Sequence, residues 1–431
     1  MKRTILITLF FIVLLTTSAF AIDISSENAI LIDTTTGRTI FQQGAYSKAF
    51  PASTTKIMTA ILTLENLELT DTLVASENAV RSVPSGGSIC DIQAGEEFTV
   101  EQLLEGLLIA SGNEAANILA EGISGTIEEF VVLMNKKSNE LDLTLTHFVN
   151  SNGLHNENHY SCAYDLAKMY RYAYNKFPDF RRITGMKAFS LPPTSIHTFD
   201  DRSFNNSNKM IIESNKYYYE PCTGGKTGFT SEAKNCLVAS ASKDGIELIA
   251  CVLGGGKTEE GESQRYLDTK ALFEYGFSNL VVKTIAKSGD ILDTLEVENS
   301  KNRSDRLNAV LSEPVTIAIE QKDLNKDFEP KITITRDMVA PISSGEYIGK
   351  ATYNVYGTYY DVDLFSGNSV EVKPDFSAGD LVADILIIIL RIIIVIVIII
   401  LILRFYNKVI RKNAKMSRSS RTRRYNARFR R

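Results

Sequence analysis

Few residues of this chain are suited to hold a metal ion. The 431 residues include five cysteines, and no two of them have the C-x-x-C spacing of a zinc site. Among the four histidines, His155 and His159 are four residues apart but lack the glutamate of an H-E-x-x-H motif. We therefore expect no metal site and no cofactor, and we place this histidine pair in an asparagine-rich polar loop.

Acidic residues are missing from the last part of the chain. Residues 404–431 contain twelve basic and no acidic residues, whereas residues 4–380 contain 32 basic and 50 acidic ones. The body is therefore acidic, with a net charge of -18, and the tail is strongly basic. An arginine-rich tail can bind nucleic acid, but beside a membrane span it is explained more simply by membrane topology and attraction to anionic lipid. We expect no nucleic-acid partner.

The start of the chain resembles the start of an exported protein. Two basic residues, an apolar run over residues 5–15 and an A-x-A ending at Ala21 have the pattern of a secretory signal peptide. We expect residues 1–21 to be this signal peptide and the mature chain to begin at Ile22. An uncleaved anchor stays open as an alternative, although the apolar run is short for a membrane span.

A second apolar run lies near the other end. Residues 385–403 are almost unbroken Ile, Leu and Val, and nineteen residues in a helix cover about 28 Å, enough to cross a bilayer core. Arg391 interrupts the run near its start, where its side chain can reach the interface. After a linker over residues 375–384, we expect a transmembrane helix that leaves the body outside the cytoplasm and the tail, residues 404–431, inside it.

The odd number of cysteines excludes a complete set of disulfides in an exported chain. A disulfide between some of them stays open, but we expect most to be small buried residues. The five are Cys90, Cys162, Cys222, Cys236 and Cys251.

The first candidate for catalysis is an S-x-x-K motif at Ser53 and Lys56. Pro51 disfavours helix upstream and apolar residues recur at helical spacing from Lys56 onward, so Ser53 is expected at or near a helix N-terminus. Residues three apart share a helix face, which brings the lysine amine near the serine hydroxyl. A buried lysine has a lowered pKa, and its neutral amine can deprotonate a serine. The motif alone is weak, because it also occurs at Ser231 and Ser240.

A second candidate lies between two apolar helices. Thr99 and Gln102 fit a capping box at the start of a helix that runs out at Ser111-Gly112-Asn113. A helical, alanine-rich pattern resumes at residue 114, so Ser111 and Asn113 are expected in the turn, where polar side chains can project into a cleft. Further helices are predicted near residues 127–141 and 163–176, and residues 28–44 are expected to form a hairpin.

The third candidate is the single K-T-G sequence at Lys226, Thr227 and Gly228. Glycines beside the lysine and threonine allow a ligand to approach the strand backbone closely. Two further strands are predicted over residues 236–241 and 246–253, with a turn at Asp244-Gly245 between them and a closing helix over residues 266–277. Short β-type runs separated by turn residues then predict a small all-β domain over residues 278–374.

The ordered motifs S-x-x-K, S-x-N and K-T-G make the strongest signal in the sequence. With them, the chain resembles the low-molecular-mass penicillin-binding proteins of the D-alanyl-D-alanine carboxypeptidase group. The stretches at residues 29–33, 107–116 and 152–154 support the resemblance, which covers about residues 24–277. It implies an α+β catalytic domain of the serine β-lactamase type over residues 22–277, an antiparallel sheet between helices with the active site at the sheet edge, followed by the all-β domain.

The resemblance also implies the chemistry of the first two motifs. Ser53 is expected to be the acylated nucleophile and Lys56 its general base. Ser111 is expected to relay a proton to the leaving amine, and Asn113 to hydrogen-bond the peptide stem of the substrate.

The K-T-G strand is expected to bind the end of the substrate. Lys226 and Thr227 would hold the terminal carboxylate beside Gly228, because a cation next to a hydroxyl suits an anion. Backbone N–H groups of Ser53 and Phe229 would form the oxyanion hole. Some relatives carry a polar side chain where Phe229 stands, so no role is assigned to its side chain.

The function expected from this resemblance is a membrane-tethered serine D,D-carboxypeptidase. It would remove the terminal D-alanine from peptidoglycan stem pentapeptides and would also be acylated by β-lactams. Two alternatives stay open. The first is a β-lactamase, for which no acidic residue suited to deacylation could be placed in the sequence, and the second is a non-catalytic cell-wall-binding protein. Several relatives resemble this chain but end in an amphipathic helix in the membrane plane, whereas the apolar run here is typical of a true span.

Overall fold

The computed structural model describes residues 22–302, 305–373 and 378–426, so the predicted signal peptide lies outside the described residues. The chain forms two compact units. The first unit combines the chain up to Ser288 with Glu313–Thr333 and Ala351–Val362, and the second contains Gly289–Ser312, Ile334–Lys350 and the chain from Asp363 onward.

A five-stranded antiparallel sheet with the order β2-β1-β9-β8-β7 organises the first unit. Its strands are β1 (Asn28–Asp33), β2 (Thr39–Gln43), β7 (Cys222–Thr230), β8 (Lys234–Lys243) and β9 (Ile246–Gly255). The predicted hairpin over residues 28–44 is confirmed by the pairing of β1 with β2. The predicted turn at Asp244-Gly245 is also confirmed, because Lys243 pairs with Ile246 across it.

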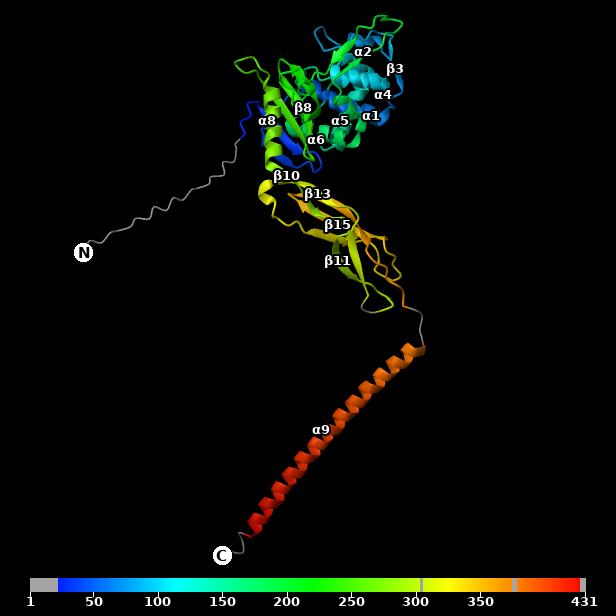
Figure 1. Cartoon of the computed structure of the whole chain (residues 1–431), viewed down its shortest axis with the longest axis vertical. Coiled ribbons are helices and arrows are strands. Elements are labelled where there is room, and N and C mark those ends of the chain that lie inside the picture. The colour runs from blue at the N-terminus through cyan, green and yellow to red at the C-terminus, as the bar shows by residue number, and fades with distance from the viewer. Residues whose placement is uncertain (1–21, 303–304, 374–377, 427–431) are drawn as a thin grey trace, which may run out of the picture. The chain divides into compact units, whose positions relative to one another are not determined.

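Each face of this sheet is covered by helices, because successive strand residues point to opposite faces. Ile30 and Ile32 belong to one core cluster, which includes residues of four helices, α1 (Lys56–Asn66), α3 (Val100–Glu105), α4 (Asn113–Ser124) and α6 (Ala163–Lys176). Ala29 and Leu31 belong to the other, which includes residues of α8 (Gln264–Asn279). Figure 1 shows α8 on one side of the sheet and α6 and α1 on the other. The predicted sheet between helices is therefore confirmed.

The remaining elements of the first unit confirm most of the predicted helices. Thr99 and Gln102 form the capping box at the start of α3, and α5 and α6 match the two predicted helices that follow. The elements are β3 (Thr72–Val74), α2 (Glu77–Arg81), β4 (Glu97–Thr99), α3 (Val100–Glu105), a π-helical turn η2 (Gly106–Ala110), α4 (Asn113–Ser124), α5 (Ile127–Glu140), α6 (Ala163–Lys176), α7 (Pro178–Thr184), β5 (Ala188–Ser190), β6 (Ser203–Asn205) and η3 (Lys209–Ile211).

Strands are the main elements over residues 280–373. β10 (Leu280–Ala286) pairs antiparallel with β13 (Val315–Glu320), which is followed by the short turn η4 (Gln321–Asp323). A five-stranded sheet has the order β11-β12-β16-β15-β14. Its strands are β11 (Ile291–Glu296), β12 (Arg306–Leu311), β14 (Pro330–Ile334), β15 (Tyr347–Val355) and β16 (Thr358–Ser366). The predicted all-β character is confirmed, while the domain boundaries of the sequence analysis stay a prediction.

One long helix, α9 (Ala378–Asn426), ends the described chain. Within it, Leu381–Arg411 is long and apolar enough to cross a membrane. The helix begins before the predicted span of residues 385–403 and continues after it, so part of the predicted linker and most of the basic tail are helical.

Candidate active site

Ser53 lies in a short 3-10 turn, η1 (Ala52–Thr55), directly before α1, rather than in the first turn of the α-helix itself. Ala52 adopts a φ of 48°, a backbone conformation that is rare for residues other than glycine and that is often found at functional sites. Strand β7 packs closely against this turn. A Cβ atom at Gly228 would lie 2.9 Å from the Pro51 carbonyl oxygen and 3.1 Å from the Ser53 nitrogen, so only glycine fits without a shift.

Lys56 is fully buried beside Ser53 and makes three polar contacts. Its Nζ lies 2.7 Å from Asn113 Oδ1, 2.7 Å from the Asn152 carbonyl oxygen and 3.0 Å from Ser53 Oγ. A neutral amine has two hydrogens and one lone pair. Since the two carbonyl oxygens can only accept hydrogen bonds, they take the two hydrogens and leave the lone pair facing the serine hydroxyl. Burial lowers the pKa of Lys56 to about 7, so this neutral form is accessible near neutral pH.

The pKa of Lys56 leads to a pH prediction. The limiting acylation rate at saturating β-lactam should rise about tenfold per pH unit below pH 7 and level off above it, because only the neutral amine accepts the serine proton. Buried His159 does not account for this change, since burial lowers its pKa to about 3. Stopped-flow acylation between pH 5 and 9 measures the profile, with folding checked by circular dichroism at each pH. A midpoint above pH 9 would instead indicate a solvated lysine.

Ser111 and Asn113 are placed by an interruption between two helices. The π-helical turn η2 ends at Ser111, whose φ of 66° is left-handed, and α4 begins at Asn113. The predicted turn between two apolar helices is therefore confirmed. It points the Asn113 amide at Lys56 and the Ser111 hydroxyl at the K-T-G strand.

Lys226 and Thr227 lie on β7, the edge strand of the central sheet. Lys226 is fully buried, and its Nζ donates to Ser111 Oγ at 2.9 Å and to the Thr227 carbonyl oxygen at 3.0 Å. Burial lowers the pKa of Lys226 well below its ordinary value, and the nearby charges of Lys56 and Arg265 lower it further. The Thr227 hydroxyl donates to Ser207 Oγ at 2.8 Å. An anion bound here would restore the charge of the lysine.

These residues surround a cleft of about 510 Å³. Six of the eight predicted site residues line it, and the two lysines lie buried behind Ser53 and Ser111. The six are Ser53, Ser111, Asn113, Thr227, Gly228 and Phe229. Phe229 has 64% of its surface exposed, so its ring is free to contact a ligand. The structure therefore brings three motifs that are far apart in the sequence into one site.

Several residues of the site were not predicted. Asn152, whose carbonyl oxygen holds Lys56, belongs to the Asn-Gly-Leu stretch that supported the resemblance, so a sequence signal existed for it. Arg265 and Ser207 also line the cleft, but neither lies in a recognisable motif. Arg265 Nη1 donates to the Gly228 carbonyl oxygen at 3.0 Å, which adds a cation beside the K-T-G strand.

The two histidines of the polar loop differ in their surroundings. His155 is partly exposed and lines the cleft. His159 lies in the same asparagine-rich loop, as predicted, but it is only 2% exposed, and its Nε2 lies 2.8 Å from Thr55 Oγ1. Among the described residues, no group of three or more His, Cys, Asp or Glu side chains is arranged to hold a metal ion.

In the other two S-x-x-K matches, which begin at Ser231 and Ser240, the side-chain contacts join the serine or the lysine to other residues. Lys234 forms an ion pair with Glu27, which draws it away from Ser231. Ser240 is buried and hydrogen-bonded to Tyr170 and Thr223. The structure therefore singles out Ser53 among the three serines.

A serine beside a buried lysine, facing a second serine–lysine pair at the edge of an antiparallel sheet, defines the class of penicillin-recognising serine enzymes. The family model for D-alanyl-D-alanine carboxypeptidases matches residues 15–257, and a model for the C-terminal domain of penicillin-binding protein 5 matches residues 282–372. The chain therefore belongs to the D-alanyl-D-alanine carboxypeptidase family, as the resemblance predicted. It is a serine-type carboxypeptidase, and the family acts on peptidoglycan and binds β-lactams.

Individual relatives match most of the chain. It is 34% identical to the D-alanyl-D-alanine carboxypeptidase DacF of Bacillus subtilis, over 75% of this chain and 80% of that protein. It is 29% identical to DacC of Escherichia coli, over 80% and 81% of the two chains. The crystal structure of penicillin-binding protein 5 from Haemophilus influenzae is similar with a TM-score of 0.62 at 26% identity, covering 81% of this chain and 98% of that one.

Proposed function

We propose that this enzyme removes the terminal D-alanine from peptidoglycan stem pentapeptides through an acyl-enzyme on Ser53. The observation that carries the proposal is the contact between Lys56 Nζ and Ser53 Oγ, with the lysine hydrogens directed to two carbonyl oxygens. Lys56 takes the hydroxyl proton while Oγ attacks the carbonyl carbon of the penultimate D-alanine. Backbone N–H groups of Ser53 and Phe229 stabilise the oxyanion that forms.

The second serine–lysine pair completes acylation. The terminal carboxylate of the substrate binds Lys226, Thr227 and Arg265, and its negative charge favours the charged form of Lys226. When the peptide C–N bond breaks, Ser111 passes a proton from Lys226 to the leaving amine of D-alanine. Asn113 donates its amide N–H to the peptide stem while its oxygen stays on Lys56. Lys226 then recovers its proton from Lys56, and the neutral Lys56 amine takes a proton from the attacking water and gives it to Ser53 Oγ as the ester bond breaks.

We further propose that the protein is exported and anchored by α9. The apolar segment Leu381–Arg411 has the length of a span, and the basic residues after it favour the cytoplasmic side. This orientation puts the catalytic body outside the cytoplasm, where stem peptides occur. The basic tail then lies against the anionic inner leaflet.

The test is release of D-alanine from a synthetic stem pentapeptide that ends in D-Ala-D-Ala. The full chain in detergent should release one D-alanine per peptide, and a peptide ending in D-Ala-L-Ala should not be cleaved. Pre-treatment with benzylpenicillin is the matched control, because it blocks Ser53 without changing the sequence and should abolish release. Intact mass spectrometry follows the adduct.

The result also separates the alternatives. A stable adduct together with D-alanine release supports the carboxypeptidase. Rapid turnover of penicillin without D-alanine release would indicate a β-lactamase. A folded protein with neither reaction would contradict both enzymatic functions.

A further inference from the structure

Phe229 brings an exposed aromatic ring into the cleft. Its surface is 64% exposed, and apart from Pro84, Ala110 and Leu154 the other described residues that line the cleft are polar or glycine. A single exposed phenylalanine on an outer surface needs no explanation. A ring inside a cleft is different, because a ligand that covers it removes apolar surface from water and gains binding free energy. The ring is therefore a candidate contact for an apolar part of the substrate.

The strand register sets the side of β7 from which this ring projects. Along the K-T-G stretch β7 pairs with β8 without a shift, so successive side chains point to opposite faces of the sheet. Thr227 lies opposite Leu237, which belongs to the core under α8, and Lys226 lies opposite Val238, which belongs to the core on the other face. Phe229 is two residues from Thr227, so its ring lies on the same face as the Thr227 side chain, the face covered by α8.

The same face carries two of the groups proposed to bind the terminal carboxylate. Arg265, in the first turn of α8, donates from Nη1 to the Gly228 carbonyl oxygen at 3.0 Å, and both Arg265 and Thr227 line the cleft. In a peptide, the terminal carboxylate is attached to the same Cα as the side chain of the last residue. The apolar group nearest to the bound carboxylate is therefore the methyl group of the leaving D-alanine, and Phe229 is the apolar side chain on this face of the strand.

We propose that Phe229 is a specificity-determining residue, whose ring contacts the side chain of the terminal D-residue of the substrate. The inference rests on the proposed function, because that function assigns the terminal carboxylate to Lys226, Thr227 and Arg265. The ring covers the methyl group of D-alanine and so favours a terminal D-alanine over glycine, which has no methyl group. The contact is apolar and needs only the face of an aromatic ring.

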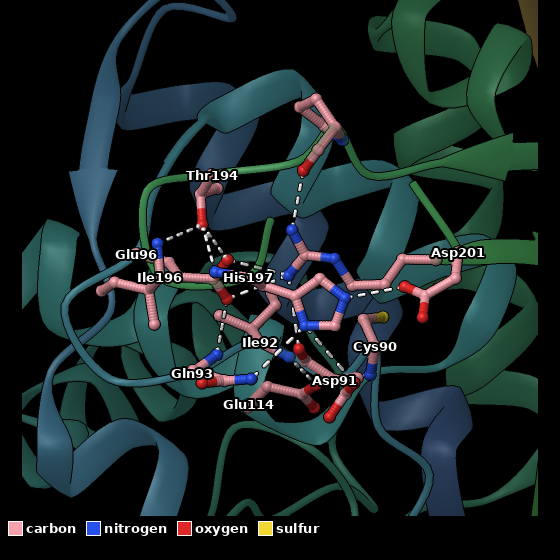
Figure 2. Close-up of polar contacts among 12 residues, drawn as sticks. Cys90, Asp91, Ile92, Gln93, Glu96, Glu114, Thr194, Ile196, His197 and Asp201 are labelled. Carbon is pink, nitrogen blue, oxygen red and sulfur yellow. Dashed lines mark hydrogen bonds and ion pairs between the residues drawn. The ribbon is translucent and has the colours of Figure 1, made fainter. Parts of the chain in front are cut away.

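Phe199 offers a matched control on the same chain. It has 70% of its surface exposed and lies in the connection between β5 and β6, outside the described lining of the cleft. Figure 2 shows His197 and Asp201, which flank it in the sequence, in contact with each other near Asp91, and His197 Nε2 lies 2.7 Å from Asp201 Oδ1. Replacing Phe199 therefore removes a similarly exposed ring without a change in the cleft.

The test compares a peptide that ends in D-Ala-D-Ala with one that ends in D-Ala-Gly, using the full chain in detergent. The kcat/KM for release of the terminal residue is measured for wild type, Phe229→Ser, Phe229→Tyr and Phe199→Ser. Wild type should prefer D-alanine, and Phe229→Ser should lower this preference about fourfold, the effect of covering one methyl group. Phe229→Tyr keeps an aromatic ring and Phe199→Ser keeps Phe229, so both should keep the preference.

The ratio of two substrates separates this role from others. A disturbed oxyanion hole or a less stable fold would slow both peptides equally, and equal slowing with an unchanged preference would overturn the inference while the proposed function stands. A wild type that does not prefer D-alanine over glycine would also overturn it. If wild type cleaves neither peptide, the proposed function fails and the inference fails with it.

Folding of the variants is checked by circular dichroism and by formation of the penicillin adduct. If Phe229→Ser does not fold, Phe229→Thr removes the ring with a residue that favours strands, and the same loss of preference is expected. Failure of both variants to fold would overturn the inference, because the exposed ring would then have a structural role.

Discussion

The variant Ser53→Ala is expected to form no covalent adduct with benzylpenicillin and to release no D-alanine. The reason is chemical, because alanine has no oxygen to attack the carbonyl and the other S-x-x-K serines have no lysine in contact. Intact mass spectrometry after incubation with penicillin measures the first loss, and the pentapeptide assay measures the second. The remaining rate should fall at least about 10⁴-fold below wild type.

The matched control for this variant is Ser231→Ala. Ser231 also belongs to an S-x-x-K motif and also lines the cleft, but Lys234 pairs with Glu27 instead. This control should form the adduct normally. An adduct on Ser53→Ala, or its loss on Ser231→Ala, would contradict the assignment of the nucleophile.

Replacing Gly153 with alanine is expected to have the largest effect on stability. Gly153 has a φ of 88°, and a Cβ there would lie 1.9 Å from the Ala52 carbonyl oxygen and 2.9 Å from Thr55 Oγ1. The clash falls on the turn that carries Ser53. We expect a loss of about 3–5 kcal/mol in the free energy of unfolding, and a folded remainder that is acylated slowly. Urea unfolding and penicillin acylation measure the two effects.

A control separates the clash from the backbone conformation. Gly125 has a φ of 79° but nothing within 4 Å of an added Cβ. Gly125→Ala should therefore lose only about 1 kcal/mol and keep full acylation. Equal losses in the two variants would contradict the importance of the contact with Ala52.

Much of the fold could be predicted because the signals were local. The capping box at Thr99 and Gln102 depends on residues three apart, and the turn at Asp244-Gly245 joins neighbouring strands. The candidate residues were predictable for a different reason. Three short motifs in a fixed order identified a family, and the family supplied a site that spacing alone did not define.

Other parts of the site depend on contacts between distant segments. The Asn152 carbonyl oxygen that holds Lys56 is a backbone atom, so any residue type could supply it. Arg265 reaches the cleft from α8 and leaves no motif, and the buried setting of His159 follows from packing against Thr55. Ser53 lies in a 3-10 turn that packs closely against Gly228 of β7. The spacing of apolar residues along the Ser53 segment carries no information about this contact with a distant strand.

The low pKa of buried Lys226 couples ligand binding to protons. A carboxylate that enters the cleft favours the charged lysine, so binding takes up a proton from solution, and by thermodynamic linkage the affinity for carboxylate ligands falls as the pH rises. Lys56 works in the opposite sense, because its amine must be free of its proton to activate Ser53. The second-order rate constant of acylation therefore depends on a charged Lys226 and a neutral Lys56. Because a lower pH favours the first and a higher pH favours the second, this rate constant should be largest at an intermediate pH.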